Sequence, residues 1–319
     1  MARPSPTEDE VLAYLTDEVF DRYKNWGRWG EDDELGTLNH LSPTKRKQAA
    51  ALVKEGFSLS CARPITPERT DAGVDSTHFM KRSGETYPED VGQDGEMQGA
   101  SDWVGINIHG LSITHLDSVG HYFRKGRMYN GLPASRVTTR EGATVQSVDT
   151  AKDGIVSRGV LLDVPRLNKV KWLEKGEPIF AEDLEAAERE AGVTVEQGDI
   201  LLVRTGEFGR RSAEGPWALV REGRAGMHAN CIPYLHERGV AVLATDCGAD
   251  VFPPGQTSFH FPIHHVGIAG MGLWLVDNCN LEDLALACAA RDRWQFLMCI
   301  APLRIEFGTG SPVNPIAVF

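Results

Sequence analysis

The alternation of apolar and polar positions predicts strands and helices in turn along most of the chain. Short apolar runs, typical of buried strands, occur at 160–162, 200–203, 240–245 and 296–300. Helical patterns lie between several of these runs, near 181–191, 228–238 and 281–290. Because strands that alternate with helices are typical of α/β proteins, we expect that fold class.

The first 56 residues carry their own helix signals. A capping box and an apolar stripe predict one helix over 7–23. A second helix should begin after Ser42, a favoured N-cap, and end before Gly56. We therefore expect an N-terminal helical extension over 1–56, followed by one domain over 57–319.

The segment 64–102 is polar, rich in glycine and charge, and without clear periodicity. Long segments of this kind in compact enzymes are usually functional or mobile. The segment is therefore a candidate lid or oligomer arm, and the alternative is a mobile surface loop.

The charge and cysteine pattern excludes some classes of function. The formal net charge of −12 argues against nucleic acid or an anionic membrane as the main partner, because both attract clusters of Lys and Arg. The six cysteines form no C-x-x-C pair, so we expect buried, reduced thiols. No apolar signal core precedes Glu10 and no run approaches the length of a membrane span, which favours a cytoplasmic protein.

The stretch 109–121 concentrates candidate chemistry in thirteen positions, with three histidines and one aspartate: His109, His115, Asp117 and His121. If its middle is a strand, His115 and Asp117 point to the same face and can chelate one cation. Imidazole with carboxylate suits zinc or manganese better than calcium. His121 can reach in from the turn that follows. The alternative is an edge strand whose polar face happens to carry these residues.

A second polar group follows 140 residues later, with His260, His264 and His265 in a proline-containing turn and then Asp277. Adjacent histidines in a turn are often only surface residues. Beside the first cluster, however, they supply the distant ligands that a metal site on a folded scaffold needs.

These two clusters resemble those of the cyclase family of metal-dependent hydrolases, which includes bacterial kynurenine formamidases and isatin hydrolases. The family motif is H-x-G-T-H-x-D-x-x-x-H, and this chain reads L-S-I-T-H-L-D-S-V-G-H over 111–121. A histidine followed twelve residues on by a carboxylate matches His265 and Asp277. The similarity runs from about Phe57 to Pro302. It implies a mixed β-sheet or barrel-like core with flanking helices, the swivelling β/β/α type.

Carried over residue by residue, the resemblance implies that His115, Asp117, His265 and Asp277 are metal ligands. It implies that His121 donates and accepts protons or lies close to the metal. In a shared metal site, one divalent transition metal, zinc or manganese, would be the cofactor.

Two positions depart from the family motif. Leu111 replaces the first histidine, and the nearest histidine, His109, lies two positions away on the same face of a strand. Asp277 replaces a glutamate and is one methylene shorter. Both changes favour one metal ion over two.

The resemblance therefore predicts a metal-dependent hydrolase of an amide C–N bond, in an arylformamide or a cyclic amide, or of a lactone. A metal-activated water would attack the carbonyl. Two alternatives remain open: a non-hydrolytic, metal-dependent cyclase or lyase, and a metal-containing binding protein without turnover. We expect a small-molecule substrate and a homo-oligomer, most simply a homodimer.

Overall fold

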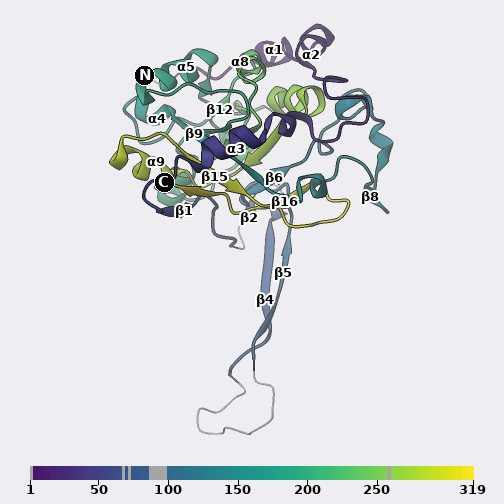
Figure 1. Cartoon of the computed structure of the whole chain (residues 1–319). Coiled ribbons are helices and arrows are strands. Elements are labelled where there is room, and N and C mark those ends of the chain that lie inside the picture. The colour runs from purple at the N-terminus through teal and green to yellow at the C-terminus, as the bar shows by residue number, and fades with distance from the viewer. Residues whose placement is uncertain (1–2, 67–68, 71–72, 86–98, 257–259) are drawn as a thin grey trace.

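A curled nine-stranded sheet forms the centre of the computed structural model, and helices cover both of its faces (Figure 1). The structure describes residues 3–66, 69–70, 73–85, 99–256 and 260–319. The strands follow the order β1-β17-β15-β9-β11-β13-β14-β6-β16 across the sheet. The expected α/β class with a mixed, barrel-like sheet is confirmed.

The centre of the sheet is parallel and both of its sides are antiparallel. The parallel strands are β9 (Ile155–Asp163), β11 (Ile200–Arg204), β13 (Val242–Thr245) and β14 (Trp274–Asp277). Beyond β9 lie the antiparallel strands β15 (Gln295–Ile300), β17 (Ile316–Val318) and β1 (Ser58–Ser60). Beyond β14 lie the antiparallel strands β6 (His115–Asp117) and β16 (Gly310–Pro312). The strands predicted from apolar runs are thus confirmed.

The central strands bury both of their faces. Val160 and Leu162 of β9 belong to one apolar cluster, Leu161 belongs to the other, and all three are fully buried. Strands covered on both faces need apolar residues at successive positions rather than at alternate ones. This requirement explains the unbroken apolar runs of the sequence.

Helices from distant parts of the chain supply the two covers. α9 (Glu282–Arg291) contributes to the cluster on one face. The other face is covered by α5 (Ala181–Ala191), α8 (Cys231–Glu237) and a π-helix (Ile263–Met271). The helices expected near 181–191, 228–238 and 281–290 are confirmed, with ends that differ by up to three residues.

Two short helices follow β11 along the chain, α6 (Glu207–Glu214) and α7 (Leu219–Glu222). A single turn of helix, α4 (Val164–Leu167), follows β9. The remaining strands form two-stranded pairs, among them β10 (Pro178–Ile179) with β12 (Gly226–Met227) and β7 (Val137–Thr138) with β8 (Gly142–Ala143). The pair of β2 (Arg69–Thr70) and β3 (Gly73–Val74) lies in the segment before the arm described below.

The prediction of one helix over 7–23 was wrong, because the structure has two: α1 (Glu8–Leu12) and α2 (Asp17–Tyr23). α1 ends at Leu12. The backbone of Thr16 is extended, and its hydroxyl accepts a hydrogen bond from Val19 N at 3.3 Å as the N-cap of α2. The capping box between Thr7 and Glu10 is present as expected.

The second N-terminal helix is confirmed as α3 (Pro43–Ala50), with the Ser42 hydroxyl accepting from Lys45 N. The N-terminal segment also contacts the rest of the chain directly, since the Thr37 hydroxyl donates to Ala241 O at 2.7 Å. The boundary between 1–56 and 57–319 stays a prediction.

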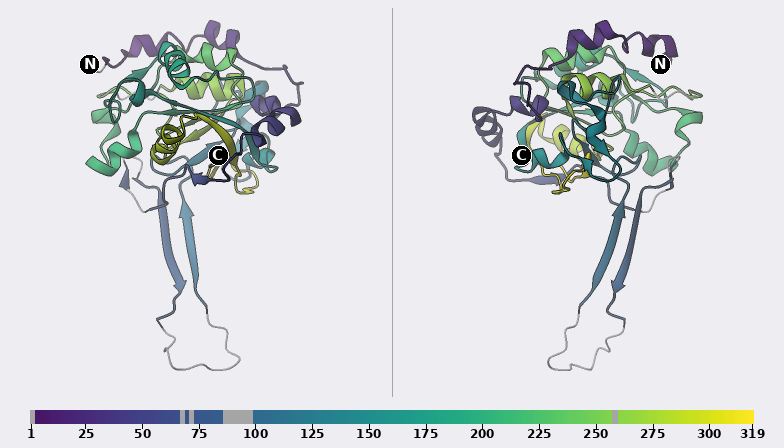
Figure 2. Two further views of the ribbon diagram at one scale, coloured as in Figure 1. Left: turned by 60° about the vertical axis from the view of Figure 1, so that its left-hand side comes forward. Right: turned by 90° about the vertical axis from the view of Figure 1, so that its right-hand side faces the viewer.

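An antiparallel arm of β4 (Ser76–Arg82) and β5 (Ser101–Ile106) extends away from the body of the molecule (Figure 1 and Figure 2). Phe79 and Trp103 stack across it with ring centroids 5.3 Å apart, and both are about half exposed. β4 and the start of β5 lie in the segment 64–102 that was expected to be a lid, an oligomer arm or a loop, and residues 86–98 of that segment lie outside the described residues. The expected homodimer stays a prediction.

Within the described part of the chain, none of the helices combines the length and the apolar character needed to cross a membrane.

A buried ionic group joins the N-terminal segment to the sheet. The Asp199 carboxylate, which is fully buried just before β11, contacts Lys45 Nζ at 2.6 Å and Arg158 Nη2 at 2.5 Å. Removal of one partner from a buried ion pair leaves charge without compensation.

We expect Asp199→Ala to lower the free energy of unfolding by about 3 kcal/mol, because Lys45 and Arg158 lose their buried anion and keep only the exposed Glu196, 3.3 Å from each. Urea denaturation measures the change. Asp21→Ala is the matched control, since Asp21 forms an exposed pair with Lys24 at 2.8 Å, and such pairs contribute less than about 1 kcal/mol. Equal effects of the two substitutions would contradict this role for Asp199.

Candidate metal centre

Strand pairing brings the two polar clusters of the sequence together. β6 carries His115 and Asp117, and it pairs antiparallel with β14 so that His115 lies opposite Asp277. All three residues of β6 are buried. A motif near residue 115 and a carboxylate 160 positions later therefore share one edge of the central sheet.

The loop before β6 has a conformation that depends on a buried carboxylate. Asp75 accepts hydrogen bonds from Leu111 N, Ser112 N and the Ser112 hydroxyl, at 2.7–2.9 Å. A Cβ atom on Gly110 would lie 2.5 Å from the Asp75 carboxyl carbon, so the loop requires glycine there. The loop starts beside His109, whose Nδ1 lies 2.8 Å from Asp117 Oδ1 and whose Nε2 lies 2.9 Å from the Thr309 hydroxyl.

A π-helix positions His264. At its start, the Asp250 carboxylate accepts hydrogen bonds from Ile263 N at 2.8 Å and from His264 N at 3.3 Å. The same carboxylate lies 2.6 Å from His264 Nδ1. His264 Nε2 then lies 3.4 Å from Asp277 Oδ2 and 3.8 Å from Asp117 Oδ2. The expected turn at 260–265 was therefore wrong, because its second half begins this helix.

Two groups of side chains share Asp117, and each could hold a metal ion. His109, His115 and Asp117 form one group, and Asp117, His264 and Asp277 form the other; in each, the donor atoms lie within 4.8 Å of one another. His115 Nδ1 forms a hydrogen bond with Ile113 O at 2.7 Å. The other ring nitrogen, Nε2, is the one on the side of Asp117.

The buried groups fit a metal ion. Asp117 Oδ2 has no hydrogen-bond partner among the described residues, and a buried carboxylate oxygen without a partner is rare and costly. The atoms around it are ring nitrogens and carboxylate oxygens separated by 3.4–3.9 Å. Ligand atoms around one tetrahedral zinc ion are roughly 3.3 Å apart.

The pKa values in this group diverge strongly. Burial disfavours the charged form of Asp117, but His121, His115 and His109 outweigh it and hold the pKa of Asp117 far below its ordinary value. Burial also opposes charge on His264, yet hydrogen bonds to Asp250 and Asp277 raise its pKa to about 10. For His121, burial dominates and lowers the pKa to about 3, so its ring is neutral at pH 7.

Five of the six site residues expected from the sequence lie together: His109, His115, Asp117, His121 and Asp277. His121 Nε2 is 3.9 Å from Asp117 Oδ2, and its ring stacks on that of His109 with centroids 3.6 Å apart. His121 belongs to neither of the two described groups of donor atoms.

His265 is the expected metal ligand that the structure does not bring into these groups of described residues. Its Nδ1 hydrogen-bonds Phe261 O at 2.9 Å, and its ring packs edge-on against Tyr122 at 4.9 Å. The neighbouring His264 occupies the position facing Asp277 instead. Successive residues of a helix point in different directions, so only one of two adjacent histidines can face the cluster.

Sequence reasoning also missed Asp250 and Arg224. No spacing pattern distinguishes Asp250 from other aspartates, and Arg224 lies in a segment without a motif. The resemblance placed His265 among the ligands, whereas the neighbouring His264 is the one that faces Asp117 and Asp277. The metal-site residues, Arg224 and Asn278 line a cavity of about 110 Å³, together with Leu111, Tyr122, Gly248 and Phe261.

Comparison with known proteins agrees with this fold. The family model of the Cyclase family, described as putative cyclase, matches residues 48–249. Isatin hydrolase of Roseibium aggregatum is 24% identical over 225 residues, which cover 69% of this chain and 74% of the relative.

Two solved structures extend the comparison. A crystal structure described as a novel cyclase is 28% identical, with a TM-score of 0.83 over 93% of this chain and 100% of that one. An isatin hydrolase bound to the product analogue thioisatinate shares the fold, at 17% identity and a TM-score of 0.57, over 88% of this chain and 97% of that one. Because the family model spans well over half of its length, the chain belongs to the Cyclase family.

Proposed function

We propose that this protein is a metal-dependent hydrolase that cleaves an amide C–N bond, in an arylformamide or a cyclic amide, or a lactone. The observation that carries the proposal is the buried Asp117 Oδ2, which has no described hydrogen-bond partner and faces the nitrogens of His264 and His121. Membership of the Cyclase family and the similarity to an isatin hydrolase support the reaction class.

The ligands that we propose are His115, Asp117, His264 and Asp277, with His109 beside them. Nitrogen and carboxylate donors without thiolate suit zinc or manganese. We propose one ion per chain, because Leu111 offers no donor atom where the family motif has a histidine and Asp277 is one methylene shorter than the glutamate of the motif. Asp250 would orient His264, as carboxylates that bind the second nitrogen of a metal-bound histidine do in other proteins.

When bound, a metal of this kind lowers the pKa of a coordinated water toward 7 and polarises the substrate carbonyl. The proton-transfer role falls to His121. It is neutral near pH 7, lines the cavity and lies outside both groups of donor atoms. It would accept a proton from the attacking water and deliver it to the leaving nitrogen or oxygen. Stacking on His109 would hold its ring in place.

The ligand assignment predicts opposite results for two adjacent histidines. We expect His264→Ala to strip most of the metal, because the Nε2 atom that faces Asp117 and Asp277 is lost. His265→Ala is the matched control and should retain nearly the full metal content, because its ring faces Tyr122. Elemental analysis after dialysis measures both. Metal loss from the His265 variant with retention in the His264 variant would refute the assignment.

A different pattern is expected for His121. His121→Gln should keep its metal and lower kcat by roughly 10²- to 10⁴-fold, the usual contribution of a general acid or base. Parallel measurement of metal content and turnover tests this, with Asp117→Asn as the variant expected to lose both. If the His121 variant loses its metal to the same extent, then His121 is a ligand and not the proton carrier.

The reaction class itself is tested with purified protein and a panel of formanilides, isatin-like lactams and lactones. We expect hydrolysis of at least one class, its loss after chelation, and its recovery with about one equivalent of Zn²⁺ or Mn²⁺. A cyclic substrate should give a ring-opened product with the mass of the substrate plus one water, and a formanilide should give an amine and formate. A product without added water would favour a cyclase or lyase. Tight metal binding without any turnover across the panel would favour a binding protein.

A further inference from the structure

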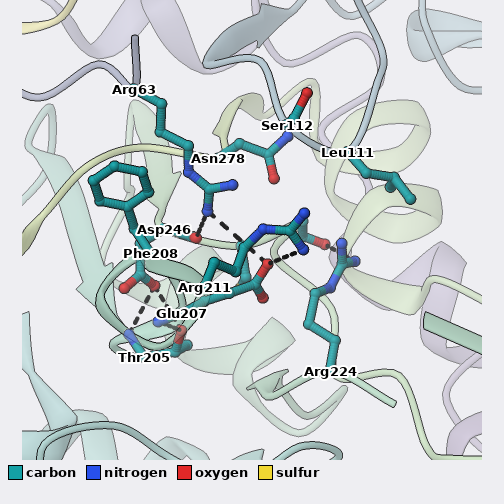
Figure 3. Close-up of polar contacts among 12 residues, drawn as sticks. Arg63, Leu111, Ser112, Thr205, Glu207, Phe208, Arg211, Arg224, Asp246 and Asn278 are labelled. Atoms are coloured by element: carbon teal, nitrogen blue, oxygen red, sulfur yellow. Dashed lines mark hydrogen bonds and ion pairs between the residues drawn. The ribbon is translucent and has the colours of Figure 1, made fainter. Parts of the chain in front are cut away.

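A second cavity adjoins the candidate metal centre and contains two arginines. It measures about 210 Å³ and is lined by Arg63, Pro64, Thr66, Ser112, Phe208, Arg211, Ser212 and Pro216. The two cavities meet at one loop, since Leu111 lines the first and Ser112 the second. Figure 3 shows Arg63, Arg211 and Arg224 with Ser112 and Leu111 of this loop, Arg63 entering from the upper left and Arg224 from the lower right. In a chain with a formal net charge of −12, three arginines thus line two neighbouring cavities.

Arg63 and Arg211 have acceptors within the protein. Arg63 Nη2 donates to the main-chain oxygen of Asp246 at 2.5 Å, and Glu207 Oε1 lies 3.9 Å from both arginines. The Asp246 carboxylate is occupied elsewhere, by Thr205 and Gly206. These two arginines therefore form part of a structural network around Glu207.

Arg224 differs from them. It is only 6% exposed, and its guanidinium lines the metal cavity. Its hydrogen bond within the described residues runs from Nη2 to Gly248 O at 3.1 Å, and Nε has no partner. No carboxylate of the described residues lies within 4.0 Å of it to form an ion pair. A buried guanidinium with five donors needs further acceptors, and a ligand in the cavity can supply them.

The position of Arg224 is fixed by its surroundings. Its backbone is bonded in both directions to Phe252, with N–O distances of 2.7 and 2.9 Å. The guanidinium lies against Gly248 so closely that an added Cβ would come within 2.4–2.6 Å of its terminal nitrogens. Only glycine leaves that space. The donor is thus held in place before any ligand arrives, which is typical of residues that orient substrates.

We propose that Arg224 binds a carboxylate of the substrate beside the candidate metal centre, so that the preferred substrate is an anionic amide or lactone. The inference rests on the proposed hydrolase function and names its substrate class. A planar guanidinium matches a carboxylate with two parallel hydrogen bonds. The candidate metal ligands and Arg224 would then take the scissile group and the anionic group of one molecule.

The kinetic test uses two substrates that differ only in charge, 2-formamidobenzoate and its neutral isostere 2-formamidobenzamide. We expect the wild-type protein to favour the carboxylate in kcat/KM. Arg224→Gln should reduce this preference by roughly 10- to 100-fold, the effect of losing a hydrogen bond to a charged group. Arg224→Lys should retain part of it. Arg221→Gln, which removes a guanidinium that is 79% exposed, is the control that should leave the preference unchanged.

A second variant guards against a general effect of the Arg224 substitutions on folding. Gly248→Ala keeps the arginine but displaces its guanidinium, and it should also lower the preference. Equal losses for both substrates in the Arg224 and Gly248 variants would overturn the proposal, because the arginine would then act on the carbonyl that both substrates share.

Binding to metal-free protein separates this inference from the proposed function. Calorimetry should give tighter binding of 2-aminobenzoate than of 2-aminobenzamide to chelator-treated wild type, and the difference should vanish in Arg224→Gln. If wild type and Arg224→Gln show the same difference in affinity between the two ligands, or if neither protein binds them, the carboxylate site is overturned. If this difference is found but no metal restores hydrolysis of any substrate, the proposed function fails and the carboxylate site stands.

Discussion

Burial of the Asp117 carboxylate is the constraint around which the candidate site is built. A carboxylate that is 1% exposed loses its hydration and must recover that energy from neighbouring donors or cations. His109 satisfies one oxygen at 2.8 Å, while the other oxygen has no hydrogen bond and faces His121 and His264. Three imidazoles lower the pKa of Asp117, so its negative charge persists at all ordinary pH values.

The mixed sheet makes this burial achievable. β6 is only three residues long, yet it lies between β14 and β16 and is bonded to both. Main-chain hydrogen bonds on both sides fix the direction of His115 and Asp117 before any metal binds. β14 supplies Asp277 at its end, and the segment after β13 supplies Asp250 for the π-helix that carries His264. Each candidate ligand is thus supported by regular structure or by a second polar group.

The cavity is lined by groups of opposite charge. Asp117 and Asp277 line it with four histidines, and Arg224 lines it where its guanidinium lies against Gly248. Such an arrangement favours ligands that are themselves polarised, with an electron-rich carbonyl toward the metal ligands and an acceptor toward the guanidinium. The loop at 110–112 lies between this cavity and the one lined by Arg63 and Arg211, since Leu111 lines the first and Ser112 the second.

Local patterns were sufficient for much of the fold. Runs such as 200–203 are apolar at every position because both faces of the sheet are covered, and the helix at 181–191 ends where Gly192 adopts a left-handed conformation. The two wrong predictions also concern local structure. The apolar stripe across 7–23 continues through Thr16, but the stripe does not reveal that its hydroxyl caps a new helix. The pattern at 260–265 indicated a turn because Pro262 is usual there, whereas Asp250 caps the segment from outside.

The sequence by itself determined the kinds of donor atoms and the short-range geometry of the site. His115 and Asp117 are two residues apart on a strand, so they share a face whatever surrounds them. Only the tertiary structure decided between His264 and His265, because the choice depends on how the π-helix is rotated over Asp250 and Asp277. It also decided which side chains hydrogen-bond to His109 and that Arg224 lines the cavity. Both depend on contacts between segments far apart in the chain. Spacing along a chain fixes the directions of neighbouring side chains, but not the distance between segments that folding brings together.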